Sequence, residues 1–359
     1  MSAKTKPKVV VGLSGGVDSS VAAALLLEQG FDVVGVHLVL SHGVPGPGAR
    51  GGQTERGLAD VQAVCGHLGI RFIALDRADQ FKCHVIEPFA SEYRAGRTPN
   101  PCVLCNQQIK FATLLATARK LGAEYIATGH YARVEHPAGE GRHLLKRASD
   151  KQQDQSYFLF SLSQEELRHA IFPLDAFRKD NVRALARDLK LPTAEKGESQ
   201  EICFVPDNDY GGFLVRAGLV QRHRGEIVTK DGRVLGYHDG VEFFTVGQRR
   251  GLRIAAERPL YVLELDPARN RVIVGYAEEL ERSSLTVTHC NWVAFESPPE
   301  MFDATVKIRY QHPGANATVK CLSAHEASVC FHESQRAVTP GQACVFYQDD
   351  LLLGGGWIA

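Results

Sequence analysis

The sequence predicts an α/β N-terminal domain with a mostly parallel sheet, followed by a small β-rich central module and a C-terminal β-barrel. In the first 130 residues, strand-like and helix-like stretches alternate, which is typical of βαβ units. From about residue 211, short β-rich runs separated by Gly, Asn, Asp and Pro take over, which favours small barrels. Because 359 residues exceed the usual size of one core, we expect domains at 1–210, 211–277 and 278–359.

The N-terminal elements are expected in a regular order. A β-branched run over 8–13 precedes a Gly-rich turn and a helical pattern that stops at Gly30, and 31–40 is expected to form a second buried strand. A Gly/Pro-rich loop covers 41–57. Beyond this loop we expect helices over 58–68, 81–93 and 106–122, and strands over 71–76 and 124–130.

Residues 131–147 are predicted to form a β-hairpin with a polar, Gly-rich turn. Ser163 and Glu166 have the spacing of a helix capping box, and Asp180 is expected to cap the next helix, which ends before Pro192. The β-rich runs then follow, and we expect strands in the segments GEIVTKDG, YVLELDPARNRVIVG, LTVTHCNWV, ATVKIRY, ATVKCL, ASVCFH and ACVFY.

Composition excludes several classes of protein. No apolar run approaches the length of a membrane span, so we expect no membrane partner. Nine cysteines without regular spacing do not indicate a disulfide framework, which favours a reducing, cytoplasmic location. The net charge is zero, so a nucleic-acid partner would have to be met by local basic patches. Candidate patches lie at Arg142–Arg147, Arg216–Arg224 and Arg249–Arg253.

The segment LSGGVDSS (13–20) lies between a predicted buried strand and a helix. Gly15 and Gly16 allow a tight turn and close approach of an anion, and the helix N-terminus directs N–H groups and its positive dipole end at it. The lysine of a Walker-type loop is missing. The segment resembles the SGGxDS pyrophosphate loop of the N-type ATP pyrophosphatases, which release AMP and pyrophosphate as they adenylate a carbonyl oxygen. That resemblance implies bound ATP, with Asp18 helping to hold Mg²⁺.

Ligands of open α/β sheets bind beyond the carboxyl ends of the strands, which adds His37, Leu38, Gly129 and His130 to the candidate residues. The full set of expected nucleotide contacts is Gly12, Leu13, Ser14, Gly15, Gly16, Val17, Asp18, Ser19, Leu38 and Gly129.

Cys102 and Cys105 form a C-x-x-C pair in a segment opened by prolines. Such a pair can serve as half of a zinc site, as a redox motif, as cluster ligands or in catalysis. We find no second C-x-x-C or His pair of suitable spacing, so no zinc site is predicted. An adenylated carbonyl would give a cysteine or its persulfide a role as nucleophile. The six cysteines other than Cys102, Cys105 and Cys203 are expected to be small buried hydrophobic residues. They are Cys65, Cys83, Cys290, Cys321, Cys330 and Cys344.

Eight segments together resemble the MnmA/TrmU family of tRNA-specific 2-thiouridylases over nearly the whole chain, which implies a PP-loop fold of the adenine-nucleotide α-hydrolase type. The segments are LSGGVDSS, GRTPNPCVLCNQQIKF, ATGHYAR, DKQQDQSYFLF, ESQEICFVP, TVGQRRGL, IRYQ and AVTPGQACVFY.

The resemblance implies ATP-dependent 2-thiolation of the wobble uridine, position 34, of the tRNAs for Lys, Glu and Gln. ATP adenylates the uridine O2, sulfur replaces it, and AMP and pyrophosphate leave. By this resemblance Cys105 is the nucleophile and Cys203 carries a persulfide received from a sulfur-relay donor, with a disulfide between the two as turnover completes. Residues matching the family's tRNA-contacting positions are Asn100, Pro101, Cys102, His130, Gln153, Asp154, Gln155, Arg309, Tyr310 and Gln342.

Cys102 departs from the family pattern, since many members carry aspartate at this position. A thiol here leaves open a [4Fe–4S] cluster held by Cys102, Cys105 and Cys203, besides the persulfide relay. Two other readings are an amide-forming PP-loop ligase, in which Cys105 and Cys203 would be idle, and a non-catalytic tRNA-binding protein. We also expect residues 196–208 to close as a lid that excludes water from the adenylated base.

Overall fold

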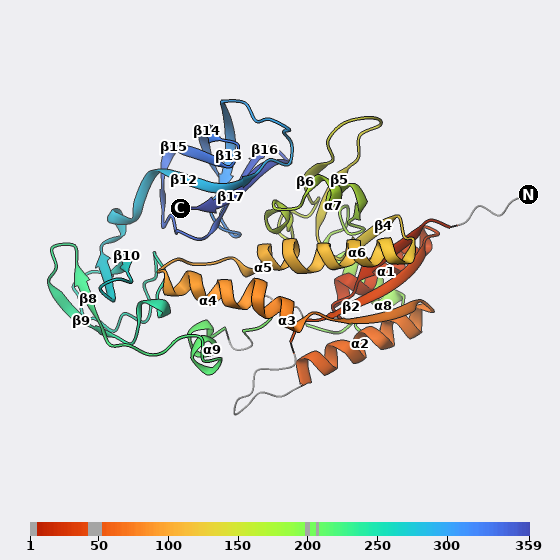
Figure 1. Ribbon diagram of the computed structural model, residues 1–359, viewed down its shortest axis with the longest axis horizontal. Helices are drawn as coiled ribbons and strands as arrows, with labels where there is room; N and C mark the ends of the chain where they lie inside the picture. The colour runs from red at the N-terminus through yellow and green to blue at the C-terminus, as the bar shows by residue number, and fades with distance from the viewer. Residues whose placement is uncertain (1–5, 42–51, 198–201, 206–207) are drawn as a thin grey trace, which may run out of the picture. The chain divides into compact units, whose positions relative to one another are not determined.

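The computed structural model describes residues 6–41, 52–197, 202–205 and 208–359 (Figure 1). The chain divides into two compact units, and each is made of more than one stretch of sequence. The first unit comprises Met1–His84, Cys102–Gln200 and Asp350–Leu352. The second unit comprises Val85–Pro101, Glu201–Asp349 and Leu353–Ala359.

The first unit is built on a parallel five-stranded sheet with the order β3-β2-β1-β4-β7. Its central strand β1 is fully buried over Val9–Val11, as the apolar run predicts. β1 pairs with β2 on one side and β4 on the other, so the chain changes direction across the sheet between β1 and β4. This switch point is where α/β sheets bind ligands. The strands are β1 (Lys8–Gly12), β2 (Asp32–Val39), β3 (Arg71–Asp76), β4 (Tyr125–Thr128) and β7 (Ala170–Ile171).

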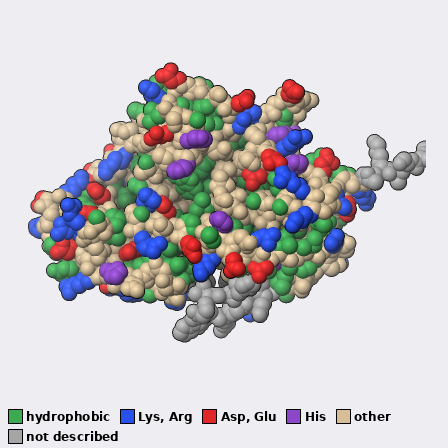
Figure 2. Space-filling view, viewed as in Figure 1, with side chains coloured by type: hydrophobic (Ala, Val, Ile, Leu, Met, Phe, Trp, Pro, Cys, Tyr) green, Lys and Arg blue, Asp and Glu red, His purple; other side chains and the backbone are tan. Residues whose placement is uncertain are grey.

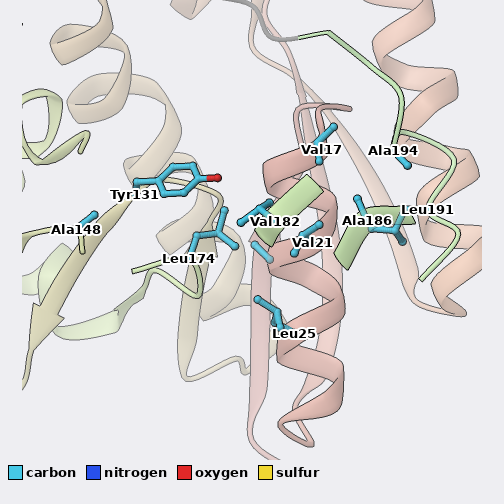
Figure 3. Packing of buried hydrophobic residues seen from close by; sticks show 11 residues of the cluster. Val17, Val21, Leu25, Tyr131, Ala148, Leu174, Val182, Ala186, Leu191 and Ala194 are labelled. Carbon is cyan, nitrogen blue, oxygen red and sulfur yellow. The ribbon is translucent and has the colours of Figure 1, made fainter. Parts of the chain in front are cut away.

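Helices flank this sheet, and the packing of α1 (Val17–Glu28) on α8 (Lys179–Asp188) forms much of one core. Figure 3 shows Val17 and Val21 of α1 facing Val182 and Ala186 of α8, with Tyr131 beside them. The other helices of the unit are α2 (Gly52–Leu68), α3 (Ala78–Phe81), η2 (Cys105–Phe111), α6 (Ala112–Leu121), η3 (Ser156–Leu159) and α7 (Gln164–His169). Two helices, η1 (Lys82–Ile86) and α5 (Pro101–Leu104), span a boundary between the units.

The predicted hairpin is confirmed as β5 (Ala132–Glu135) and β6 (Leu144–Arg147), and the capping box is confirmed at α7. The predicted cap of α8 is wrong. Arg178 occupies the N-cap position of α8, and Asp180 lies in the first turn, where its charge still favours the helix dipole.

The helix predicted over 81–93 is confirmed, but it contains the π-helical turn η1 and becomes α-helical at α4 (Glu87–Arg94). Pro88, in the first turn of α4, has no N–H to donate and excludes a regular bond to the preceding turn. The helix predicted over 106–122 likewise begins as the π-helical η2 and becomes α-helical at Ala112.

The second unit contains two all-β parts, as predicted. A small sheet has the order β10-β11-β8-β9, and a larger antiparallel sheet closes into a barrel through the pairing of β12 with β17. The strands are β8 (Gly225–Thr229), β9 (Val234–His238), β10 (Tyr261–Asp266), β11 (Arg271–Gly275), β12 (Glu281–Asn291), β13 (Met301–Lys307), β14 (Ala315–Ser323), β15 (Glu326–Arg336), β16 (Ala343–Gln348) and β17 (Leu351–Ile358). Its short helices are α9 (Tyr210–Arg216), η4 (Val241–Phe243) and η5 (Ala277–Leu280).

Strand β17 is an element that the sequence did not predict. Glycines are poor strand formers, and Gly354–Gly356 lie in its middle. Pairing with β12 at the barrel seam compensates for this low intrinsic propensity.

The expected burial of the six remaining cysteines holds for Cys65, Cys290 and Cys344. It is wrong for Cys83 and Cys330, which are exposed, while Cys321 is half-buried. Cys330 occupies a solvent-facing position of β15, where side chains alternate between core and solvent.

Charge is mixed over the surface. Figure 2 shows Lys and Arg side chains interspersed with Asp and Glu over the face it draws, in keeping with the net charge of zero. No helix within the described residues is long and apolar enough to cross a membrane.

Candidate active site

The segment LSGGVDSS leaves the end of β1 and enters α1 at the switch point of the sheet. Gly15 has φ of +76°, and a Cβ atom there would lie 2.9 Å from the carbonyl oxygen of Gly57. Any larger residue would therefore be strained by its backbone conformation and by this contact. The glycine predicted to allow a tight turn is required for that reason.

Hydroxyl groups hold the loop in shape. The Ser19 Oγ accepts from the Ser14 backbone N–H at 3.2 Å and donates to the Gly16 carbonyl at 3.1 Å. Ser20 Oγ also donates to the Gly16 carbonyl, at 2.9 Å. Gly16 is the N-cap of α1 and has an extended backbone conformation. Because it is a glycine, no N-cap side chain bonds to the first N–H groups of the helix. The helix dipole and the first-turn N–H groups therefore face the loop, as an anion requires.

Asp18 is held by two side chains that the sequence pattern did not single out. Lys179 Nζ lies 2.9 and 2.8 Å from the two carboxylate oxygens, and Tyr131 donates its hydroxyl to Oδ1 at 2.9 Å. The Lys179 side chain is only 12% exposed. Lys179 is the first residue of α8, so the α1–α8 packing brings this cation to the loop. A lysine 161 residues further along the chain is thus paired with Asp18 of the loop.

A second lysine reaches the loop from the chain beyond α8. Lys196 Nζ donates to the Gly15 carbonyl at 2.8 Å and pairs with Asp60 at 2.5 Å. Thr193, in the same segment, donates to Ser20 Oγ at 3.0 Å. The start of the expected lid over 196–208 is therefore tied to the loop, whereas residues 198–201 and 206–207 of that lid lie outside the described residues.

The other predicted strand ends also converge here. His37 Nδ1 lies 2.8 Å from the Leu13 carbonyl and so fixes the start of the loop, and the next residue, Leu38, is half-buried near the end of β2. Gly129 follows β4, and a Cβ there would lie 2.7 Å from backbone atoms of Asp18 and Ser19. The absent side chain of Gly129 makes room for the first turn of α1.

His130 packs between aromatic rings. Its ring centroid lies 6.0 Å from that of Phe111 and 6.2 Å from that of Phe172, and its Nδ1 lies 2.8 Å from Thr128 Oγ1. Burial, with a smaller contribution from Lys110, lowers the pKa of His130 to about 3. The imidazole is therefore neutral at physiological pH, which suits stacking or hydrogen bonding and not a charge contact with phosphate.

The predicted nucleophile Cys105 opens the π-helical stretch η2 and is 4% exposed, while Cys102 in the preceding turn is half-buried. Asn106 Nδ2 donates to the Phe158 carbonyl at 3.1 Å and so ties the cysteine segment to η3. Local π-helical geometry is often found at functional sites. Asn100 and Pro101, expected to face the target base, are buried immediately before Cys102.

Cys203 occupies a tight turn of the second unit. The Val205 N–H donates to the Ile202 carbonyl at 2.8 Å, which leaves Cys203 exposed at the corner. The neighbouring Phe204 packs edge-on against Phe89 of α4 at 5.2 Å and against Phe213 of α9 at 5.3 Å. The aromatic contacts anchor the turn in which Cys203 is exposed.

Residues 153–155, which are expected to contact tRNA, are held by hydrogen bonds to other residues of the first unit. Asp154 is 5% exposed, and its carboxylate accepts from the backbone N–H groups of Ala148 and Ser156. Gln155 exchanges two hydrogen bonds with the backbone of Tyr131. Gln153 is half-buried, like Gln155, in a loop that Asp154 braces from inside.

Three other expected tRNA contacts lie in the second unit. Arg309 is exposed just after β13, and Lys307 Nζ lies 5.6 Å from the ring centroid of the adjacent Tyr310. Gln342 precedes β16, and its side chain donates to the carbonyls of Thr98 and Pro99.

Within the described residues, no three His, Cys, Asp or Glu side chains gather closely enough to hold a metal ion.

A parallel sheet with an SGGxDS loop at its switch point defines the class of PP-loop proteins, which act on ATP. Three family models match the chain in succession. They are described as the tRNA methyl transferase HUP domain at residues 7–207, the tRNA methyl transferase PRC-barrel domain at 213–276 and the aminomethyltransferase beta-barrel domain at 282–358.

Two similar curated proteins are each named tRNA-specific 2-thiouridylase MnmA. The protein from Acidithiobacillus ferrooxidans is 48% identical over 98% of both chains, and that from Geobacter metallireducens is 47% identical over 100% of this chain and 98% of its own. The chain therefore belongs to the MnmA family of tRNA-specific 2-thiouridylases, which confirms the family and the fold class predicted from sequence.

Solved structures are more distant. The NMN synthetase of Francisella tularensis is 16% identical with a TM-score of 0.33, covering 60% of this chain and 83% of its own. A 4-thiouridine synthetase in complex with RNA and ATP is 19% identical with a TM-score of 0.36, covering 56% and 46%. At this level of similarity neither structure bears on the chemistry of this chain.

Proposed function

We propose that the protein is a tRNA-uridine 2-sulfurtransferase that uses ATP to replace the O2 atom of the wobble uridine by sulfur, in the tRNAs for Lys, Glu and Gln. The observation that carries the proposal is the SGGVDSS loop at the β1/β4 switch point, in a chain 48% identical to 2-thiouridylases over nearly its full length. The amide-forming ligase is not favoured, because the curated relatives from Acidithiobacillus ferrooxidans, Geobacter metallireducens and Solibacter usitatus, at 45–48% identity, are named thiouridylases.

The first step is adenylation. The uridine O2 attacks the α-phosphorus of ATP, a new O–P bond forms, and pyrophosphate leaves with the electrons of the broken P–O bond. The N–H groups at the start of α1 and the two lysines near the loop, Lys179 and Lys196, favour the negative charge that pyrophosphate carries away.

Magnesium would bind beside Asp18. Mg²⁺ usually takes one or two carboxylates together with substrate phosphates and water. The carboxylate of Asp18 accepts from Lys179 and Tyr131, and a carboxylate has about four lone-pair positions, so one position can still serve a metal ion. The residues present therefore fit such an ion.

The second step moves sulfur. The terminal sulfur of a Cys203 persulfide attacks C2 of the adenylated uridine and AMP leaves with the electrons of the C–O bond. The Cys105 thiolate then attacks the Cys203 sulfur, which forms a Cys105–Cys203 disulfide and leaves the terminal sulfur on C2 as the thiocarbonyl. A dithiol reductant restores both thiols, and a persulfide donor reloads Cys203. The exposure of Cys203 supports its reloading by a donor protein.

The expected tRNA contacts Asn100, Pro101, Cys102, His130, Gln153–Gln155, Arg309 and Tyr310 are part of this proposal. So are the domain limits at 1–210, 211–277 and 278–359, and a cytoplasmic location, which the irregular cysteine spacing supports. Gln342 is left out of the tRNA contacts, because its side-chain amide donates to the Thr98 and Pro99 carbonyls.

The test is made anaerobically on iron-free protein with tRNA, Mg-ATP and a persulfide-generating desulfurase, with AMP and 2-thiouridine quantified by mass spectrometry. Both products are expected in equal amounts. Cys203→Ser is expected to form AMP without 2-thiouridine, and Asp18→Asn to lose AMP formation while tRNA affinity stays within about threefold.

Each contrary result has a distinct meaning. Wild-type rates of thiolation by Cys203→Ser would remove Cys203 from the reaction. AMP without 2-thiouridine in the iron-free wild type would favour the [4Fe–4S] cluster held by Cys102, Cys105 and Cys203. The absence of tRNA-dependent AMP would favour the ligase.

A further inference from the structure

Three sequence segments of the second unit meet at one place. They are RTPN (97–100), which precedes Cys102, TVGQ (245–248) of the central module and TPGQ (339–342) of the barrel. Thr98 is the meeting point, because its N–H donates to the Pro340 carbonyl at 2.8 Å and its Oγ1 donates to Thr245 Oγ1 at 3.3 Å. Neither TVGQ nor TPGQ has a role in the chemistry proposed above.

Gln342 holds this segment by its side-chain amide. Its Nε2 donates to the Thr98 carbonyl at 2.9 Å and to the Pro99 carbonyl at 3.2 Å. The Gln342 backbone is fixed in turn, since its carbonyl accepts from the Ile358 N–H at 2.9 Å. One nitrogen with two N–H groups thus satisfies two successive carbonyls from a rigid position.

Gly341 allows the two backbones to approach. Its φ is +86°, and a Cβ there would lie 3.0 Å from Arg97 Cβ and 3.1 Å from both the N and O atoms of Thr98. A side chain at position 341 would therefore displace the same segment that Gln342 binds. The two residues make independent contacts with one target, the backbone of residues 97–99.

The TVGQ segment of the central module also contacts the chain at residues 337–339. Thr339 Oγ1 donates to the Val246 carbonyl at 3.5 Å, and a Cβ on Gly247 would lie 2.6 Å from the Cβ of Ala337. TVGQ and TPGQ are therefore packed against each other as well as against Thr98.

We propose that Gln342 is a positioning residue, which fixes Thr98 and Pro99 so that the next two residues, Asn100 and Pro101, are held ready for the target base. This role rests on the proposed function. The amide nitrogen of Gln342 is directed at protein carbonyls, so its effect on tRNA acts through the segment it holds. TVGQ and TPGQ are the support of that segment.

Position 342 requires a hydrogen-bond donor, because both partners of its side chain are carbonyl oxygens. A glutamate at position 342 would set a carboxylate, which only accepts hydrogen bonds, against two carbonyl oxygens in a half-buried place. Gln342→Glu has nearly the same shape and so tests the donor alone. Gly341→Ala disturbs the same backbone by size and leaves the amide in place. Gln348→Glu, at the exposed end of β16, is the matched control.

The experiment measures three quantities on the full chain. Hydrogen exchange of the Thr98 amide is followed without tRNA or ATP, the tRNA Kd is measured without ATP, and the rate of AMP formation is measured at saturating tRNA. For Gln342→Glu and Gly341→Ala, Thr98 is expected to exchange at least about tenfold faster and AMP formation to slow about 10- to 100-fold, with Kd within about threefold. Gln348→Glu is expected to match the wild type.

Other results overturn the proposal. A weakened Kd with unchanged exchange and an unchanged rate at saturation would make Gln342 a direct tRNA contact. Unchanged exchange in both variants would remove the support role. A wild type without tRNA-dependent AMP would refute the proposed function, and the exchange measurement would still decide whether Gln342 and Gly341 hold residues 97–99, because it uses neither substrate.

Discussion

Lys179 is a distant residue that pairs with the aspartate of the SGGVDSS loop. It pairs with both oxygens of Asp18 and lies 5.6 Å from the ring centroid of Tyr131, with a largely buried side chain. Replacing it by methionine keeps the length of the side chain and removes the cation, so Asp18 loses its partner in a partly buried place. Breaking such a pair is more costly than breaking a surface pair.

We predict that Lys179→Met lowers the free energy of unfolding by about 1–3 kcal/mol and slows tRNA-dependent AMP formation by about 10- to 100-fold. Urea unfolding and the AMP assay measure the two effects. Lys151→Met is the control, because Lys151 pairs with Asp350 at 49% and 57% side-chain exposure and should change neither quantity noticeably. Wild-type AMP formation by Lys179→Met would show that the cation serves stability alone.

His130 makes stability depend on pH. Its folded-state pKa of about 3 lies below the ordinary value of 6.5, chiefly because of burial. The unfolded chain therefore binds a proton first as the pH falls, and the free energy of unfolding decreases between about pH 6.5 and pH 3.

We predict that the wild type loses about 1–2 kcal/mol more than His130→Gln between pH 7.5 and pH 5.0, as measured by urea unfolding. The other histidines are common to both proteins, so the difference between them isolates His130. Equal losses in the two proteins would show that His130 can take up its proton in the folded state.

Helix α4 contacts the Cys203 turn through an aromatic side chain and is continuous with the segment at residues 97–100. Phe89 on its buried face receives Phe204, the neighbour of Cys203, and the chain beyond its C-terminus leads into residues 97–100. Tyr93 of the same helix stacks on Tyr210 at 4.5 Å, which fixes the start of α9. The position of the Cys203 turn therefore depends on an aromatic cluster that α4 and α9 share.

We predict that Phe204→Leu slows 2-thiouridine formation by about three- to tenfold and leaves AMP formation unchanged, because an aromatic pair contributes about 0.5–1.5 kcal/mol beyond its buried area. Quantifying both products in one reaction checks this. Phe31→Leu, which removes an edge-on contact with Tyr125 in the first unit, is the control. A parallel loss of AMP would place Phe204 in the adenylation step.

Local structure explains which elements the sequence predicted. Buried β-branched runs and alternating strands were assigned correctly, because their hydrophobic periodicity is a local property. The π-helical turn before α4, the π-helical start at Cys105 and strand β17 were missed. These depend on a proline inside a helical pattern and on pairing partners far along the chain, which periodicity does not report.

For the whole molecule, a net charge of zero means that tRNA must be bound by local basic groups. Arg309 is exposed beside Tyr310 and is the cation we expect to meet a phosphate. Arg309→Ala is predicted to reduce the slope of log Kd against log salt by about 0.7–0.9. Filter binding across a series of KCl concentrations measures this slope. Arg119→Ala, which removes an exposed ion pair with Glu165, is expected to leave it unchanged.

Contiguous residues specify the class of sheet, the nucleotide loop and the family, because the signal for each is the spacing of residues along a short segment. Two contacts form only when the chain folds: Lys179 pairs with Asp18, and Gln342 binds the backbone before Cys102. These contacts join residues 161 and 244 positions apart, and a single sequence carries no local pattern for them. Packing of α1 on α8 and closure of the barrel bring them together, and both depend on the folded chain.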